Sequence, residues 1–279
     1  MDYRNKFVAK PQAKVRLSKI DPSYKGNHET RGAALPEIQK HVERLGSLQY
    51  LLYAEGNQSL LVVLQALDAG GKDGIIRHVF SGMNPQGTFV FGFKQPSKEE
   101  LAHDFLWRVH LRAPGKGDFV IFNRSHYEDV LVVRVHNLVP ESVWSKRYDQ
   151  INDFEAMLSR NGTTVLKFFL HISPEEQLSR FKQRLDDPSR QWKITESDYS
   201  ERELWSKYMD AYDDAIAKTS TKQAPWYIVP ANHKWFRNLA VSQIIADTME
   251  EMGLKLPPTH VDIAEIRQKF HAAEGAAKN

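Results

Sequence analysis

The sequence lacks cysteine, and this absence excludes several kinds of chemistry. With no cysteine among 279 residues, the chain has no disulfide, no thiolate zinc site and no cysteine nucleophile. Long apolar runs are also lacking, because the longest, residues 60–67, is interrupted by Gln65 and is too short to cross a bilayer. The polar N-terminal segment has no signal-peptide core. We therefore expect a cytoplasmic protein with no membrane partner.

A strong charge of one sign is missing as well. The 38 Lys and Arg residues against 35 Asp and Glu give a net charge of +3. This is too weak to indicate nucleic-acid binding from bulk charge, so no nucleic-acid partner is expected and any functional basicity must be local. The composition is ordinary for a globular protein, with 41% hydrophobic and 26% charged residues, so the chain can bury a core.

Continuous apolar runs alternate with helical patterns along the chain. Such runs suit strands that are buried on both faces of a parallel sheet, and their alternation with helices indicates three α/β/α layers. Strands are predicted at 59–67, 88–93, 118–123, 164–172 and 226–230. Helices are predicted at 34–53, 141–160, 198–218 and 236–252, with further helix starts capped by Ser97 and Ser173.

No linker composition separates these elements, so residues 1–279 are predicted to form a single domain. Residues 1–58 would be an N-terminal extension and helix, and residues 1–33 show no periodicity and are interpreted as an extended arm. The core would run from 59 to 252. Residues 253–279 would be a polar tail with one helix near 261–273.

A glycine-rich turn follows the first predicted strand. Gly70, Gly71 and Gly74 would let the backbone approach a phosphate at the start of the next helix, where free N–H groups point at an anion, and Lys72 adds positive charge. We predict phosphate contacts along the whole loop, from Ala69, Gly70, Gly71, Lys72, Asp73 and Gly74. The alternative is a tight turn that needs glycine for geometry alone.

This loop departs from the strict phosphate-loop pattern at two positions. Ala66 stands where the first glycine belongs, and Asp73 replaces the hydroxyl that binds Mg²⁺. Asp68, directly before the loop, would repel phosphates unless a metal ion or a positioning task accounts for it. The alternative for Asp68 is a helix cap.

A second polar motif, FNRSHYEDV at residues 122–130, ends the third predicted strand. Ligands of open parallel sheets bind at such strand ends, so this motif should lie beside the glycine-rich loop. Arg124 could donate two parallel hydrogen bonds to a phosphate. The alternative is a polar turn capped by Ser125.

These two motifs, followed by QWKI at 191–194 and APWYIVPANHKWFRNLAV at 224–241, resemble the second polyphosphate kinase family over roughly residues 34–252. The resemblance implies a P-loop kinase fold close to thymidylate kinase and a homo-oligomer. It implies phosphoryl transfer between inorganic polyphosphate and a nucleotide with Mg²⁺ as cofactor. By matched motif, Asp68, Lys72 and Arg124 would be catalytic, with Asp68 as the metal ligand.

The second motif differs from that of many family members. Asn123 replaces an aspartate, and residues 126–128 replace a Trp-Tyr-Asn run. These differences resemble the subgroup that acts on both nucleoside mono- and diphosphates, with adenine and also guanine nucleotides as candidates. We accordingly predict a phosphate contact for His126 and nucleotide contacts for Asp68, Asn123, Tyr127, Glu128 and Asp129.

The family resemblance also implies a helical lid at about residues 180–200. Arg180 and Arg184 share one helix face, and together with Lys193 they are predicted to bind phosphate. The alternative is a solvated charged helix. Lys94, just after the second strand, is a further candidate phosphate ligand, with a surface lysine as the alternative.

Two other functions remain open on the sequence. An ATP-dependent nucleotide kinase could use the same fold, because fold does not determine function. A non-catalytic anion- or nucleic-acid-binding module is the alternative from another class, although weak net charge disfavours it.

Overall fold

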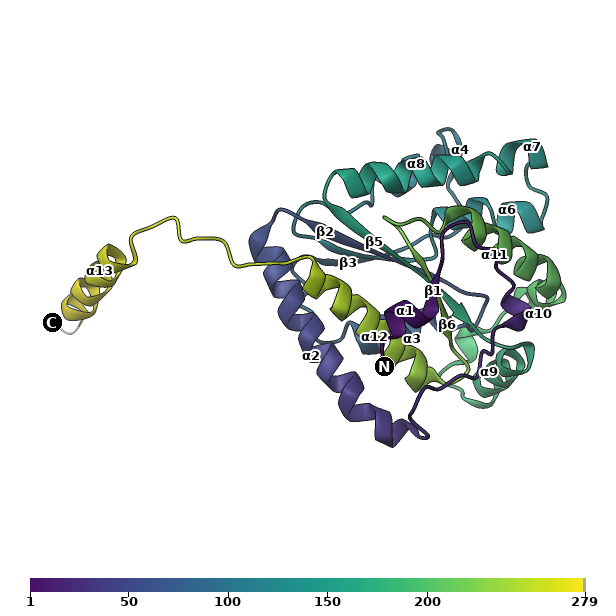
Figure 1. The fold of residues 1–279 in the computed structure, drawn as a ribbon, viewed down its shortest axis with the longest axis horizontal. Coiled ribbons are helices and arrows are strands. Elements are labelled where there is room, and N and C mark those ends of the chain that lie inside the picture. Colours follow the sequence, from purple (N-terminus) through teal and green to yellow (C-terminus); the bar gives the residue numbers. More distant parts are fainter. Residues whose placement is uncertain (278–279) are drawn as a thin grey trace.

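The computed structural model describes residues 1–277 and contains a six-stranded sheet (Figure 1). The strands lie in the order β1-β6-β5-β2-β4-β3. Their bounds are β1 Val8–Ala9, β2 Ser59–Gln65, β3 Thr88–Gly92, β4 Phe119–Asn123, β5 Thr163–His171 and β6 Trp226–Pro230. Strands β2 to β6 pair in parallel, so the predicted parallel sheet is confirmed.

The N-terminal arm differs from the prediction. Residues 1–33 contain helix α1 (Tyr3–Phe7), strand β1 and the 3-10 helix η1 (Leu17–Lys19). Strand β1 adds antiparallel to the edge strand β6, and Tyr3 and Leu17 are buried. The sequence pattern missed this because β1 has only two residues and α1 only five, too few to show a period.

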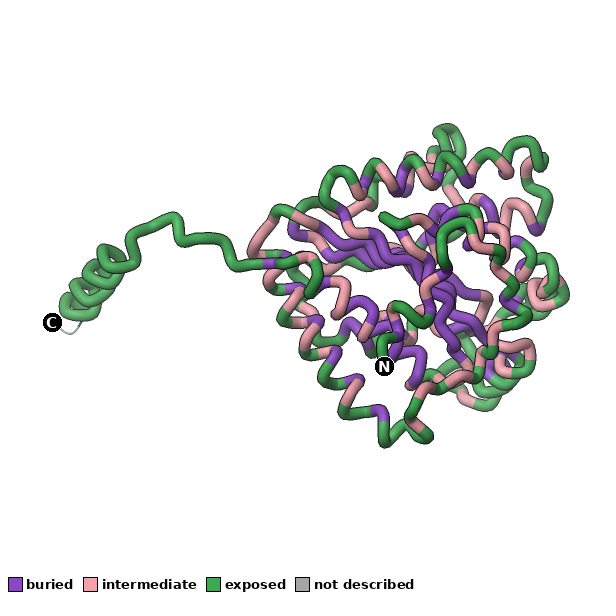
Figure 2. The backbone as a smooth tube through the Cα atoms, in the orientation of Figure 1, coloured by how far each residue is buried: buried purple, intermediate pink, exposed green. Residues whose placement is uncertain are grey.

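Helices cover both faces of the sheet and make two hydrophobic cores. Along β2, Leu60 and Leu64 face the core under α2, α3 and α12, whereas Leu61 and Val63 face the core under α6, α8 and α11. Figure 2 shows the strands as the most buried part of the chain. This confirms the predicted three-layer architecture, in which a strand covered on both faces is apolar at every position.

The helices agree with the expected order, with local differences. Helix α9 begins after the predicted cap Ser173, and α4 after Ser97, each cap accepting a backbone N–H. The helix predicted at 198–218 is interrupted at Leu204, and that at 141–160 at Ser145 and Lys146. The bounds are α2 Arg31–Glu55, α3 Lys72–Val79, α4 Lys98–Leu101, α5 Trp107–His110, η2 His126–Asp129, α6 Val132–Val135, α7 Glu141–Trp144, α8 Arg147–Arg160, α9 Pro174–Asp186, η3 Gln191–Lys193, α10 Glu196–Glu203, α11 Trp205–Thr219 and α12 Lys234–Glu251.

The C-terminal helix α13 (Ile263–Ala276) lies apart from the body at the end of an extended segment (Figure 1). None of its residues is buried. Among residues 1–277, no helix combines the length and apolar composition that a membrane crossing needs.

Strand register places the two sequence motifs side by side. Leu64 of β2 pairs with Asn123 of β4, so the loop after β2 and the turn after β4 leave the same edge of the sheet. The backbone N–H of Arg124 donates to the carbonyl of Leu64 at 3.1 Å. The carboxyl ends of β2 and β4 therefore form one polar surface.

Candidate active site

The phosphate loop, residues 68–74, contains two residues with positive φ, a backbone conformation that residues other than glycine rarely adopt. Ala69 has φ +58° and Gly71, which precedes α3, has φ +106°. A Cβ built on Gly71 would lie 1.8 Å from Nη1 of Arg237, so the loop passes directly over a buried arginine. Glycine is required here for close approach as well as for backbone conformation.

Lys72 begins α3 and donates from Nζ to the carbonyl of Ala66 at 2.8 Å. Burial lowers the pKa of Lys72 to about 8, and the nearby charge of Arg124 lowers it further, while Asp68 and Glu128 oppose the shift. A half-buried ammonium group whose hydrogen-bond partner is a single carbonyl is suited to bind an anionic ligand.

Arg124 lies between two carboxylates at the end of β4. Its Nη2 donates to Asp68 Oδ1 at 2.8 Å, and its Nη1 lies 3.5 Å from Glu128 Oε2. Glu128 in turn accepts from Gln65 Nε2 at 3.0 Å. The side chain of Arg124 remains 40% exposed, so a phosphate can reach the guanidinium without unfolding the site.

Arg124 also has an uncommon backbone conformation, with φ +63°. This left-handed conformation costs roughly 1 kcal/mol or more in a residue other than glycine and persists only where surrounding contacts hold it. From this turn the guanidinium reaches Asp68, the first residue of the phosphate loop.

Asp73 joins the loop to β4 and to the segment after α9. Its Oδ1 accepts from Asn123 Nδ2 at 3.0 Å, and its Oδ2 lies 3.3 Å from Lys193 Nζ. Burial alone would raise the pKa of Asp73, but the hydrogen bonds from Asn123 and Lys193 lower it overall. Asp73 thus bridges the side chains of Asn123 and Lys193, and the predicted contacts of these three residues with phosphate and nucleotide stay predictions.

Arg180 has a different position from the one predicted. It is 5% exposed and lies behind the phosphate loop. All five of its N–H donors have protein partners, namely the carboxylate of Glu176 and the carbonyls of Ala69, Gly70, Ala231 and Asn232. The predicted phosphate contact of Arg180 is therefore corrected: its donors are already used, those of Nη1 on the loop carbonyls of Ala69 and Gly70 and the others on residues outside the loop.

Arg237, from α12, was missed by sequence reasoning. It is 2% exposed, and its Nη2 and Nε donate to Asn238 Oδ1 at 2.8 and 3.1 Å. Burial lowers its pKa to about 9, and the nearby charge of Arg180 contributes. Its sequence signal is an arginine within an otherwise apolar face of α12, at the helix start beside the loop.

His126 and Tyr127 do not reach the polar surface. Both are 0% exposed, and both contact the buried carboxylate of Glu155, at 3.2 Å from His126 Nε2 and 2.8 Å from Tyr127 Oη. Their predicted contacts with phosphate and nucleotide are therefore corrected: the 3-10 turn η2 points these two side chains into the core.

The remaining candidates lie at the margin of the site. Asp129 accepts from Arg147 Nη1 at 3.0 Å, and burial raises its pKa. Arg184 lies 3.4 Å from the carbonyl of Lys193. Lys94 is exposed.

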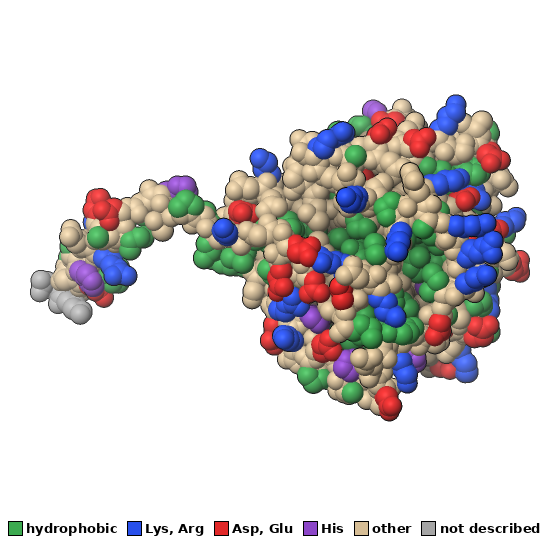
Figure 3. Space-filling view, in the orientation of Figure 1, with side chains coloured by type: hydrophobic (Ala, Val, Ile, Leu, Met, Phe, Trp, Pro, Cys, Tyr) green, Lys and Arg blue, Asp and Glu red, His purple; other side chains and the backbone are tan. Residues whose placement is uncertain are grey.

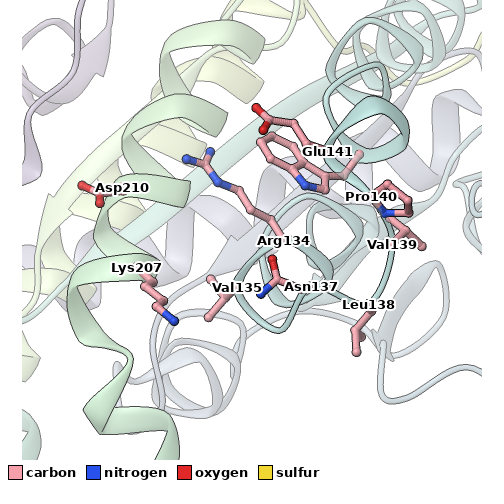
Figure 4. A pocket seen from close by; sticks show the side chains of 10 residues that line it. Arg134, Val135, Asn137, Leu138, Val139, Pro140, Glu141, Lys207 and Asp210 are labelled. Carbon is pink, nitrogen blue, oxygen red and sulfur yellow. The ribbon is translucent and has the colours of Figure 1, made fainter.

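A groove lies elsewhere, between α6, α7 and α11. It measures about 490 Å³, and Figure 4 shows Arg134 and Lys207 among the side chains around it. Arg134 already donates to Asp214 at 2.7 Å and stacks on Trp144. Lys and Arg side chains gather mainly on the side of the body away from α13 (Figure 3).

The donor set fits Mg²⁺ bound together with phosphates. Within residues 1–277, no three His, Asp or Glu side chains form a cluster of metal-binding geometry. Mg²⁺ in phosphoryl-transfer sites needs only one or two protein carboxylates, since phosphates and water supply the rest. Asp68 and Asp73 are the two carboxylates of the phosphate loop, residues 68–74, and would be the protein ligands of such an ion.

The chain is similar to known proteins in both sequence and fold. A model of the family described as Polyphosphate kinase 2 matches residues 29–257. The chain belongs to the polyphosphate kinase 2 family. A solved structure of Polyphosphate Kinase 2 from Arthrobacter aurescens TC1 superposes with a TM-score of 0.90 at 40% identity, over 95% of this chain and 98% of that one. The predicted family and its P-loop kinase-like fold are thereby confirmed.

Two relatives in the polyphosphate kinase 2 family are similar over nearly their whole length. One from Meiothermus ruber, named AMP/ADP-polyphosphate phosphotransferase, is 51% identical over 90% of this chain and 95% of its own. One from Rhodopseudomonas palustris, named ADP-polyphosphate phosphotransferase, is 46% identical over 91% of this chain and 92% of its own.

Proposed function

We propose that this polyphosphate kinase 2 family member moves phosphoryl groups between inorganic polyphosphate and nucleoside mono- and diphosphates, reversibly and with Mg²⁺. It would convert AMP to ADP and ADP to ATP. The observation that carries the proposal is the convergence of Lys72, Arg124 and Asp68 on a phosphate loop at the carboxyl ends of β2 and β4. The names of the two relatives support the donor and the acceptors.

The proposed chemistry is positioning and charge neutralisation. The attacking oxygen is the terminal phosphate oxygen of the nucleotide, which is largely ionised at neutral pH, so no strong general base is needed. Lys72 would bind the phosphoryl oxygens at the start of α3, and Arg124 would donate to them from the opposite side. Charge spread over these oxygens in the transition state is what such cations stabilise.

Asp68 and Asp73 would hold Mg²⁺ in this scheme. When bound, the ion would neutralise negative charge on the phosphates. Asp68 also accepts a hydrogen bond from the guanidinium of Arg124 at 2.8 Å, and it would hold that cation in place. A cytoplasmic location and a homo-oligomeric state stay predictions.

The donor and acceptor are tested by supplying long-chain polyphosphate with AMP or ADP, Mg²⁺ and no ATP, and separating the nucleotides by chromatography. We expect ADP and ATP from AMP, and ATP from ADP. Product from ADP alone would retain the polyphosphate donor and remove the monophosphate acceptor. Product only when ATP replaces polyphosphate would instead establish an ordinary nucleotide kinase.

A further inference from the structure

A buried polar cluster lies directly under the turn that carries Arg124. Its charged members are Glu155 on α8 and Lys167 on β5, which are 1% and 0% exposed. A fully buried ion pair costs several kcal/mol to desolvate per ion, so a chain gains little stability from it alone. The position of this pair calls for another explanation.

Lys167 uses its three N–H donors within the cluster. Nζ lies 2.5 Å from Glu155 Oε2, 2.9 Å from Tyr127 Oη and 2.7 Å from the carbonyl of Thr219. The rings of Tyr127 and Trp226 lie above the ammonium group at 5.4 and 5.5 Å. The ammonium group is thus directed towards the turn η2 and bound to its tyrosine.

Glu155 contacts the same turn with its other oxygen. Oε1 accepts from Tyr127 Oη at 2.8 Å and lies 3.2 Å from His126 Nε2. Burial alone would raise the pKa of Glu155, but Lys167 and His126 lower it overall, so the carboxylate is charged and can accept all three contacts. Glu155 therefore holds the side chains of two consecutive residues of η2, His126 and Tyr127.

The turn needs such support. It has only four residues, and it follows Arg124 at φ +63°, a conformation that surrounding contacts must impose. Its side chains point to two sides: His126 and Tyr127 contact the buried cluster, and Glu128 Oε2 lies 3.5 Å from Arg124 Nη1. Because the cluster holds the side chains of His126 and Tyr127, it also fixes the backbone that carries Arg124 and Glu128.

We propose that Tyr127, Glu155 and Lys167 are positioning residues for Arg124, so that this buried cluster sets the rate of phosphoryl transfer without touching a substrate. The inference rests on the proposed function. A positioning role differs from a purely structural one in its kinetic effect: variants of the cluster should lose kcat with little change in KM. The reason is that Arg124 acts on the transition state, whereas other cations contribute to ground-state binding.

Two variants test the cluster. Tyr127→Phe removes the hydroxyl and keeps the ring, and the double variant Glu155→Leu/Lys167→Met removes both charges together, which avoids an unpaired buried charge. We expect kcat to fall about 10- to 100-fold in each, the scale of a misplacement near 1 Å, with KM for polyphosphate within about twofold. Hydrogen–deuterium exchange should rise in the peptide that spans 122–131.

Ser59→Ala is the matched control, because Ser59 and Thr163 form a buried hydrogen bond of 2.9 Å at the opposite end of β2 and β5. It should leave kcat and the exchange of 122–131 unchanged. Folded cluster variants with wild-type kcat and wild-type exchange would overturn the proposal. If the wild type transfers no phosphate from polyphosphate, the proposed function fails, and the exchange of 122–131 alone then decides whether the cluster positions Arg124.

Discussion

The charge on Lys72 depends on pH within the range in which enzymes are assayed. Its pKa is lowered to about 8 by burial and by Arg124, so the cation that attracts phosphate is lost as pH rises through 8. We expect kcat/KM, which reports the free enzyme, to fall up to about tenfold per pH unit above that value.

The control for this pH dependence is Lys72→Arg, whose guanidinium stays charged. We expect a lower absolute rate for the variant, with no decline between pH 7 and 8.5, a range that lies below the pKa of about 9 of the nearby Arg237. A wild-type profile of kcat/KM that stays flat to pH 9.5 would show that another group binds the phosphate.

The space at Gly71 is a second residue-scale constraint. A Cβ there would overlap Nη1 of Arg237, and the φ of +106° would be strained. We expect Gly71→Ala to remove most transfer activity, and to lower the free energy of unfolding by about 1 to 3 kcal/mol if the chain folds. Urea unfolding and the transfer assay measure both effects.

Gly32→Ala provides the comparison for Gly71→Ala. It adds a methyl group near the start of α2, where the nearest heavy atom would be Thr30 Oγ1 at 3.9 Å. Alanine favours helix by about 1 kcal/mol over glycine, so this variant should be neutral or slightly stabilised. Equal effects of the two substitutions would contradict the proposed close contact.

At the scale of elements, the segment after α9 reaches the phosphate loop through one cation. Lys193 Nζ lies 3.3 Å from Asp73 Oδ2. Arg190, in contrast, pairs with its neighbour Asp187 at 2.9 Å. We expect Lys193→Ala to raise KM for polyphosphate about tenfold, the worth of one charge-assisted hydrogen bond, and Arg190→Ala to have a smaller effect. Initial rates over a range of polyphosphate concentrations measure the difference, and a larger effect of Arg190→Ala would invert the assignment.

The elements themselves show how far sequence reasoning reaches. Strands such as 59–65 and the caps Ser97 and Ser173 were predictable, because burial on two faces and capping leave local signals. The pairing of β1 with β6 was not, since it depends on two residues meeting a strand more than 200 positions away. The same limit applies to Arg180 and His126, whose residue types suggest a ligand although their burial depends on the whole fold.

On the scale of the whole molecule, the body and the C-terminal helix are separate. Residues 255–277 are exposed throughout, and α13 buries nothing against the sheet or its helices (Figure 2). We expect removal of residues 259–279 to shift the thermal midpoint by less than about 2 °C, because a domain of this size shifts by about 2–4 °C per kcal/mol. A drop of more than about 5 °C in differential scanning calorimetry would show that the tail contributes to the stability of the body.

The fold brings together the sequence motifs that carry the family resemblance. Two motifs that residues 75–121 separate in the chain, at 68–74 and 122–130, meet at one edge of the sheet. The order of the motifs identified the family, whereas the positions of Arg237 and of the Glu155–Lys167 pair required the three-dimensional arrangement.

The account depends most on Arg124 as the cation that stabilises phosphate transferred from polyphosphate. The direct measurement follows the label from ³²P-polyphosphate into ATP with ADP as acceptor, for the wild type and Arg124→Ala side by side. The wild type should label ATP, and the variant, folded by circular dichroism, should do so about 10²- to 10³-fold more slowly, as when one transition-state donor is removed. Equal labelling by both proteins, or no labelling by either, would contradict the account.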